Sequence, residues 1–365
     1  MDDFPVFAVA DDLSGAAETA VALGVRGTRS VVLLQARDSS AEVVVVDTDS
    51  RALPPGAAAA AVTSALTSVR PGDRVFKKID SLLRGNVSAE IGALVSHGFG
   101  VVVTPALPIA GRTVVDGVLR VDESGWRANC ATPREVMPSA LTLGLDVVRG
   151  PALADSLAKA ADARVAVVCD AETDGDLDLI AAAAVRAPAN LALAGSGALA
   201  AALGRMRTTT SPFVATPAGG AVLVVVGTAE PVAAQQVALL SGSSVHTFDV
   251  DALLAGQVPV PPVHGVTVLR VGPAKGLVPD VSAALARVVA AVAGTPDLVL
   301  IGGETGRRVL DALGVDELEP LDQIHHGAVR SRTRDGRVVV TRPGSFGGPD
   351  SLAQIVRALT ERQFP

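Results

Sequence analysis

The segment FPVFAVADDLSG (residues 4–15) decides the fold class. Its apolar residues 4–10 predict a buried strand, and Asp11, Asp12 and Ser14 are typical of the place where a helix begins. The same order returns along the chain: a short Val, Ala and Leu run, a polar or glycine-rich cluster, and an alanine-rich stretch with helical periodicity. This alternation predicts an α/β fold in which mostly parallel sheets are flanked by helices on both faces.

Apolar runs of strand length occur throughout the chain. In the first half we expect strands at residues 31–34, 42–46, 101–104, 165–169 and 191–194. In the second half we expect them at residues 221–226, 266–271, 298–301 and 338–341. Segment 278–292 places Val281, Leu285 and Val288 on one face, so we expect a helix that packs on a sheet.

The composition divides the chain into two domains. Between Thr208 and Gly220 it changes to threonine, serine, proline and glycine, which suits a connector. We place the boundary there, with one domain over residues 1–215 and the other over residues 216–365. Each domain is expected to contain its own mostly parallel sheet, and the active site is expected in the interdomain cleft.

Composition and charge exclude several classes of protein. With 49% hydrophobic and 19% charged residues, the chain is not disordered. The apolar runs are far shorter than the ~20 residues of a membrane span, and the start lacks the features of a secretion signal. We therefore expect a cytoplasmic protein with no membrane partner. A net charge of -7 argues against a nucleic-acid partner. The oligomeric state is left open, with a homo-oligomer as one alternative.

The densest chemistry lies in KKIDSLLRGN (residues 77–86), which follows Val75 and Phe76. It combines cations, a carboxylate, a hydroxyl and an amide at tight spacing, although a solvated charged turn is the structural alternative. Ligands in open α/β sheets bind beyond the carboxyl ends of strands. We interpret the cluster as a site for a carboxylate or phosphate, in which Asp80 could accept a proton from a substrate hydroxyl.

Other strand ends in the first half add polar groups. One of Asp11, Asp12 and Ser14 is expected to cap a helix, but two carboxylates exceed what capping requires. Arg51, after the strand at residues 42–46, is a candidate to hold a carboxylate through two hydrogen bonds, with an ordinary surface arginine as the alternative. Arg112 lies in a rigid loop that also provides donors.

The second half has glycine-rich strand ends at residues 227–231, 302–306 and 343–350. Glycine lets the backbone approach a ligand closely, and backbone amides at the start of a helix favour phosphate. Three such loops in one domain indicate a nucleotide site. The first domain is therefore assigned to a small anionic substrate and the second to a nucleotide.

Other catalytic patterns fit poorly. Gly195-Ser196-Gly197 resembles part of a dinucleotide fingerprint, but no acidic residue follows at about 20 positions. No phosphate-loop motif and no Gly-x-Ser-x-Gly elbow occurs. His325 and His326 are adjacent, and neighbouring strand positions face opposite sides, so a shared metal is not expected.

Taken together, six motifs resemble the four-carbon acid sugar kinase family, in the same order and over almost the whole chain. They are ADDLSGA (10–16), KIDS (78–81), LRGN (83–86), GRT (111–113), GGET (302–305) and GSFGGPD (344–350). Segments 78–86 and 346–350 are the most specific. The resemblance implies ATP-dependent phosphoryl transfer to a hydroxyl of a threonate-, erythronate- or 3-oxo-tetronate-like acid. It also implies an N-terminal substrate domain and a C-terminal nucleotide domain.

The resemblance carries over to individual positions. It implies that a small-molecule sugar acid is bound by Asp11, Asp12, Arg51, Asp80, Ser81, Arg84 and Arg112. It implies that ATP is bound by Thr228, Ala229, Gly302, Gly303, Glu304, Thr305, Gly344, Ser345, Phe346 and Gly347. The family usually has Asp at position 304, Ser at position 306 and Lys-Ser-Gly-Asn at positions 342–345, so this chain departs from it there.

These residues suggest a mechanism based on positioning and charge neutralisation. Arg51 and Arg84 would hold the carboxylate of the sugar acid, and Lys78 would offset charge on the transferred phosphoryl group. The catalytic base would be Asp12 or Asp80, and the sequence does not decide between them. Glu304 would hold Mg²⁺ directly or through water. The alternative is a non-catalytic protein of the same fold that binds a sugar acid and a nucleotide.

Overall fold

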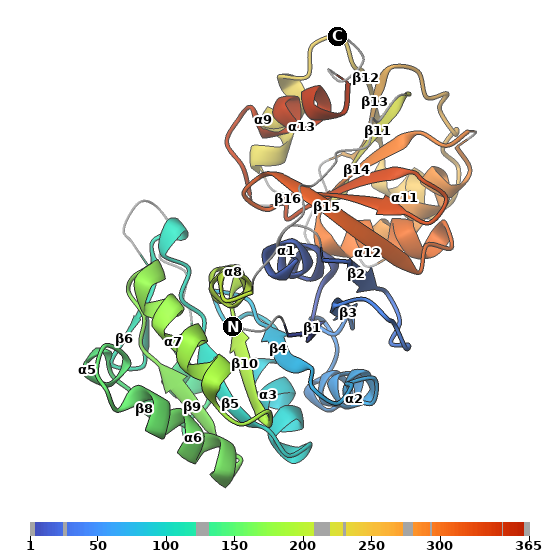
Figure 1. Cartoon of the computed structure of the whole chain (residues 1–365). Helices are drawn as coiled ribbons and strands as arrows, with labels where there is room; N and C mark the ends of the chain where they lie inside the picture. Colours follow the sequence, from blue (N-terminus) through green and yellow to red (C-terminus); the bar gives the residue numbers. More distant parts are fainter. Residues whose placement is uncertain are drawn as a thin grey trace. The chain divides into compact units, whose positions relative to one another are not determined.

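The computed structural model describes residues 4–24, 28–121, 131–207, 220–228, 231–272, 280–292, 294–344 and 346–360. The chain forms two compact units, Met1–Pro212 and Phe213–Pro365, shown in Figure 1. The expected connector, at residues 208–219, lies outside the described residues. The boundary between residues 215 and 216 falls within that stretch and stays a prediction.

The main sheet of the N-terminal unit has the strand order β2-β3-β1-β4-β10-β5-β9-β8. Its strands are β1 (Val6–Ala10), β2 (Ser30–Leu33), β3 (Val43–Asp47), β4 (Arg74–Lys78), β5 (Gly100–Thr104), β8 (Leu141–Leu143), β9 (Ala166–Cys169) and β10 (Leu191–Gly195). All neighbouring strands are parallel. In the register, Ala10 pairs with both Asp47 and Lys78, and Gly195 pairs with Lys78. The segments that follow these strands therefore begin at the same edge of the sheet.

Helices flank this sheet on both faces. The longer ones are α1 (Leu13–Leu23), α2 (Pro55–Leu66), α3 (Val87–Ser96), α6 (Leu153–Ala163), α7 (Asp174–Arg186) and α8 (Gly197–Arg205). Helix α1 packs against α8, and α2 packs against α3. Shorter elements are α4 (Pro133–Val136), α5 (Leu145–Val148), the 3₁₀ turn η1 (Pro108–Ala110) and a separate antiparallel hairpin of β6 (Arg112–Val115) and β7 (Val118–Val121).

The C-terminal unit contains strands in the order β12-β13-β11-β14-β17-β16-β15. They are β11 (Val222–Val226), β12 (Ser244–Phe248), β13 (Val266–Val271), β14 (Asp297–Ile301), β15 (Glu317–His325), β16 (Ala328–Thr333) and β17 (Val338–Arg342). The pairs from β12 to β17 are parallel, whereas β17-β16 and β16-β15 are antiparallel. The helices are α9 (Pro231–Ala238), α10 (Val250–Leu254), α11 (Val281–Ala290), α12 (Gly303–Ala312) and α13 (Ser351–Thr360).

The core explains why these segments form strands. Valines from β11 pack with residues of α9 and α13, including Val237, Leu352 and Ile355, in one buried cluster. Each such side chain stabilises the fold by roughly 1.5–3 kcal/mol when it leaves water. Strands covered on both faces are apolar along their whole length, which is why the sequence predicts them well.

The expected fold class is confirmed: both units contain mostly parallel sheets flanked by helices. In the C-terminal unit the sequence did not identify β12, β15 or β16, because polar residues interrupt the apolar pattern of these strands. In the N-terminal unit it did not identify the short strands β6, β7 and β8. Among the described residues, no helix combines the length and the apolar character that crossing a bilayer requires.

Candidate functional site

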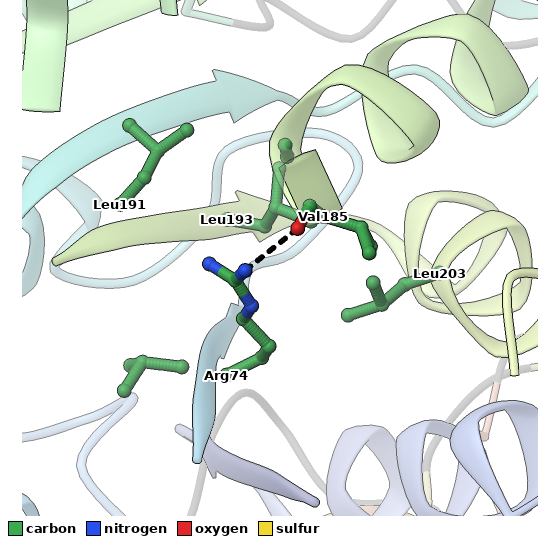
Figure 2. A pocket seen from close by; sticks show the side chains of 7 residues that line it. Arg74, Val185, Leu191, Leu193 and Leu203 are labelled. Atoms are coloured by element: carbon green, nitrogen blue, oxygen red, sulfur yellow. Dashed lines mark hydrogen bonds between the residues drawn. The ribbon is translucent and has the colours of Figure 1, made fainter. Parts of the chain in front are cut away.

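A small cavity lies at the amino ends of β4 and β10 and is not the candidate site (Figure 2). Its volume of about 10 Å³ holds roughly one water molecule. Arg74, the first residue of β4, donates hydrogen bonds there to the carbonyl oxygens of Val185 (2.6 Å) and Ala187 (3.0 Å) at the end of α7. Arg74 thus has a structural role, and the polar clusters lie at the opposite ends of these strands.

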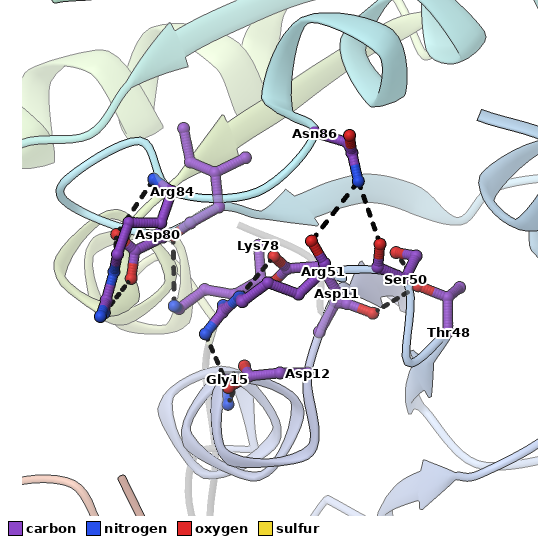
Figure 3. Close-up of polar contacts among 12 residues, drawn as sticks. Asp11, Asp12, Gly15, Thr48, Ser50, Arg51, Lys78, Asp80, Arg84 and Asn86 are labelled. Atoms are coloured by element: carbon purple, nitrogen blue, oxygen red, sulfur yellow. Dashed lines mark hydrogen bonds and ion pairs between the residues drawn. The ribbon is translucent and has the colours of Figure 1, made fainter. Parts of the chain in front are cut away.

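Arg51 brings together the two acids that follow β1. Its Nε and Nη2 atoms donate to Asp11 Oδ2 and Oδ1 at 2.8 and 2.7 Å, and its Nη1 atom donates to Asp12 Oδ2 at 2.8 Å. Asp12 is also the N-cap of α1, because its Oδ1 atom accepts from the backbone N–H of Gly15 at 2.9 Å. One acid therefore both caps the helix and contacts the arginine (Figure 3).

The loop that carries Arg51 is held by the loop that follows β4. Asn86 Nδ2 donates to the carbonyl oxygens of Ser50 (3.1 Å) and Leu53 (2.8 Å), as Figure 3 shows in part. The backbone N–H groups of Ser50 and Arg51 in turn donate to the Asp11 carbonyl oxygen. The ends of β1, β3 and β4 thus form one connected polar cluster.

The two acids differ in their pKa. Burial acts to raise the pKa of Asp11, but the positive charges of Arg51, Lys77 and Lys78 outweigh it and hold this pKa below its usual value. For Asp12, burial and the neighbouring Asp11 charge exceed the effect of Arg51, so its pKa is raised. A proton therefore binds more readily to Asp12 than to Asp11.

Asp80 pairs with Arg84 on the same loop. Arg84 Nε and Nη2 donate to Asp80 Oδ2 and Oδ1 at 3.0 and 2.7 Å, and the Leu82 N–H donates to Oδ2 at 2.9 Å. Burial opposes ionisation of Asp80, but these hydrogen bonds prevail and lower its pKa to about 2. The Arg84 side chain remains 60% exposed.

The depressed pKa of Asp80 predicts a pH dependence of stability. Because the folded pKa lies below the usual 3.8, Asp80 stabilises the fold above pH 3.8, and this contribution is lost as the pH falls toward 2. Asp80→Asn should lower the free energy of unfolding by about 1–2 kcal/mol at pH 7, a range reduced because Arg84 is screened by solvent. Urea titrations at pH 7 and pH 2.5 measure this. The control is Asp116→Asn, at an exposed aspartate; equal effects of the two variants would contradict the prediction.

The adjacent lysines of β4 face opposite sides of the sheet, as neighbouring strand positions do. Lys77 is completely buried, and its Nζ atom lies 2.9 Å from Glu90 Oε2 on α3. Ser50 Oγ donates to the other Glu90 oxygen at 2.6 Å. Lys78 Nζ lies 3.6 Å from Glu18 Oε2 on α1 and donates to the Ile79 carbonyl oxygen at 3.2 Å. Lys77 thus belongs to a core ion pair, whereas Lys78 lies with Asp12 on the α1 side.

Arg112 was expected in a rigid loop, but it is the first residue of β6 and pairs with Val121 in the hairpin. Its Nη1 atom donates to Ser81 Oγ. The turn of that hairpin is held by Asp170, a buried residue that follows β9. Its two carboxylate oxygens accept from the N–H groups of Asp116 (2.6 Å) and Gly117 (2.9 Å). Asp170 therefore holds the turn of the hairpin from which Arg112 comes.

In the C-terminal unit, the glycine loops meet at the carboxyl ends of parallel strands. Val226 pairs with Ile301, and Ile301 pairs with Arg342, so the three strands end at the same edge. A Cβ atom on Gly344 would lie 2.5 Å from Thr228 Oγ1, so glycine is required for the close contact of these loops. Gly302, with a φ of 103°, directly precedes α12.

The described residues that were predicted to bind the nucleotide lie at different positions in these loops. Gly303, Glu304 and Thr305 form the first turn of α12, where backbone N–H groups favour phosphate. Phe346 and Gly347 lie in the loop before α13. Ala229 and Ser345 lie outside the described residues.

In the part of the chain that the structure describes, no group of three or more His, Cys, Asp or Glu side chains is arranged to hold a metal ion. Glu304 is exposed in the first turn of α12. A single carboxylate fits a Mg²⁺ ion that is bound mainly by phosphate and water oxygens.

Comparison with known proteins agrees with the division into two units. Residues 6–203 match the family described as "Sugar-binding N-terminal domain", and residues 269–352 match "Nucleotide-binding C-terminal domain". A D-threonate kinase of Cupriavidus necator is 33% identical, with 98% of each chain covered. The chain belongs to the four-carbon acid sugar kinase family.

A further family member and a solved structure are also similar to this chain. A family member named 3-oxo-tetronate kinase, from Methylobacterium radiotolerans, is 28% identical over 94% of this chain and 96% of its own. The crystal structure of Haemophilus influenzae protein HI1011 has a TM-score of 0.71 with 22% identity, covering 97% of this chain and all of that one. At this identity the structural likeness supports the fold alone.

Sequence reasoning missed three acids that hold the candidate cluster or the neighbouring hairpin: Glu18, Glu90 and Asp170. Glu18 and Glu90 lie in helices, where isolated charges are usually solvated, so nothing in their local pattern distinguishes them. Asp170 follows a predicted strand, at residues 165–169, and its place at a strand end was the one signal that could have found it.

Proposed function

We propose that this protein is an ATP-dependent kinase that phosphorylates a hydroxyl of a four-carbon sugar acid. The observation that carries the proposal is the charged cluster at the ends of β1, β3 and β4, which lies within the match to sugar-binding domains. Relatives over nearly the full length are kinases of such acids, which supports phosphoryl transfer as the reaction.

The acid would be recognised by cations and hydroxyls of the N-terminal unit. Arg51 already directs all its donor nitrogens to Asp11 and Asp12, so we assign it to orienting these acids rather than to holding the substrate carboxylate. Arg84, which is 60% exposed, and Arg112 with Ser81 are better placed to receive that carboxylate. Lys78 would neutralise charge on the phosphoryl group as it transfers.

Asp12 is favoured over Asp80 as the general base. A base works best when its pKa approaches the working pH, and the pKa of Asp12 is raised whereas that of Asp80 is lowered to about 2. Asp12 would accept the proton of the attacking hydroxyl on its carboxylate. Asp80 would keep Arg84 in place.

The nucleotide would bind at the glycine loops of the C-terminal unit, with its phosphates at the start of α12. Thr228 and Thr305 would add hydroxyl donors, and Glu304 would hold Mg²⁺ directly or through water. The ion would supply positive charge that offsets the phosphate oxygens. Phosphoryl transfer requires that the two bound substrates meet during the catalytic cycle.

The test is ADP release by the full-length protein with ATP and a panel of D-threonate, D-erythronate and 3-oxo-tetronate. ATP-dependent product formation with at least one acid is expected. A five-carbon sugar acid is the control for chain length. A thermal shift on acid binding without ADP release would instead favour the non-catalytic binding protein, and no response to any acid would contradict both functions.

A further inference from the structure

Arg342 differs from the other buried arginines of the C-terminal unit. Arg307 and Arg330 pair with Asp311 and Asp322. Arg342 is 0% exposed, and among the described residues no carboxylate pairs with it. Its Nε and Nη2 atoms have no hydrogen-bond partner in that part of the chain. A buried, uncompensated cation is costly, so a counter-ion that binds nearby would be stabilised.

The guanidinium lies beneath the last glycine loop. Arg342 Nη1 donates to the carbonyl oxygen of Phe346 and to Ser351 Oγ, the latter at 2.7 Å. A Cβ atom on Gly347 would lie 2.8 Å from Nη1. Gly347 itself is exposed, so the guanidinium lies beneath a loop that reaches the surface.

Two carbonyl oxygens of the same loop accept hydrogen bonds from a buried glutamine side chain. Gln236 is buried, and its Nε2 atom donates to the carbonyl oxygens of Gly347 (3.1 Å) and Gly348 (2.8 Å). In a trans peptide the C=O and N–H groups point in opposite directions. With the oxygens of Phe346 and Gly347 held by buried side chains, the N–H groups of Gly347 and Gly348 point away from those side chains.

We propose that the Phe346–Gly348 loop, with Arg342 beneath it, binds a phosphate group of the nucleotide. The backbone N–H groups of Gly347 and Gly348 donate to phosphate oxygens, and the Arg342 charge strengthens these bonds at short range in a poorly solvated environment. The inference rests on the proposed function and deepens it: Arg342 is a positioning and electrostatic residue for phosphate, not for the nucleoside. Its removal therefore reduces the preference for ATP over adenosine.

The test compares Arg342→Gln and Arg342→Lys in the full-length protein by calorimetric titration with ATP and with adenosine. Both variants keep a donor for the loop, but only lysine keeps the charge. The ratio of ATP to adenosine affinity should fall by about 10- to 100-fold in the glutamine variant and stay within about 3-fold in the lysine variant. Arg357→Gln, at an exposed arginine of α13, is the matched control and should leave the ratio unchanged.

The outcomes distinguish a failure of the proposed function from a failure of the role assigned to the Arg342 charge. If the wild type does not bind ATP, the proposed function fails. If the wild type binds ATP and the glutamine variant keeps the same ratio, or if both Arg342 variants lose the preference equally, only the role of the charge fails.

A second measurement needs no variant and decides the matter if Arg342→Gln does not fold. Hydrogen exchange of the wild-type amides of Gly347 and Gly348 should be slower with saturating ATP than with saturating adenosine. Equal exchange with both ligands would overturn the phosphate site.

Discussion

Replacing Asp12 by asparagine is expected to lower kcat by about 10²- to 10⁴-fold, the range typical for loss of a general base. Asparagine is as good an N-cap as aspartate, so α1 should begin at the same residue. Asparagine has one oxygen for the Gly15 N–H and loses the hydrogen bond from Arg51 Nη1. Because the raised pKa of Asp12 means that its ionised form is disfavoured in the folded protein, this loss should change stability little. The loss should therefore be catalytic rather than structural, and initial rates with unfolding curves measure it.

The pH profile identifies the base. A base must be ionised, so the rate should fall as the pH decreases through its folded pKa, which for Asp12 lies above 3.8. For Asp80 the corresponding fall would occur near pH 2. Wild type and Asp80→Asn should therefore share an acid limb above pH 3.8. Near-normal turnover of Asp12→Asn together with a large loss in Asp80→Asn would assign the base to Asp80.

Replacing Lys77 by methionine is expected to destabilise the N-terminal unit by about 3–5 kcal/mol. Lys77 and Glu90 are both buried, with Nζ and Oε2 2.9 Å apart, so the variant leaves the Glu90 carboxylate buried without its counter-charge. This is a large part of a typical domain stability of about 5–15 kcal/mol. The urea midpoint of the N-terminal unit, followed by circular dichroism, measures the effect.

The double variant Lys77→Met/Glu90→Leu is the control for that prediction. Replacing both members of a buried ion pair by apolar residues is often neutral, so most of the lost stability should return. Ser50 Oγ would lose Glu90 as a partner but keeps its contact with Thr48 Oγ1 at 2.8 Å. If the double variant is no more stable than Lys77→Met, the destabilisation does not arise from the unpaired carboxylate.

Much of the fold could be predicted because strands buried on both faces carry a strong local signal. The expected strand at residues 4–10 corresponds to β1, and that at residues 266–271 has the same bounds as β13. The helix expected at residues 278–292 is observed as α11 over Val281–Ala290. Partly exposed strands such as β12 lack this signal, since their side chains need not be apolar.

The sequence predicted which strand ends carry the candidate site, but not which charged side chains pair with one another there. The sequence by itself determined which residues follow the strand ends, because periodicity fixes where each strand stops. It placed Lys77 and Lys78 together in one charged cluster that follows Val75 and Phe76. Only the tertiary structure decided that the Lys77 side is covered by α3 with Glu90, and the Lys78 side by α1 with Glu18. Charge pairing depends on the packing of segments distant in sequence, and local pattern contains no information about that packing.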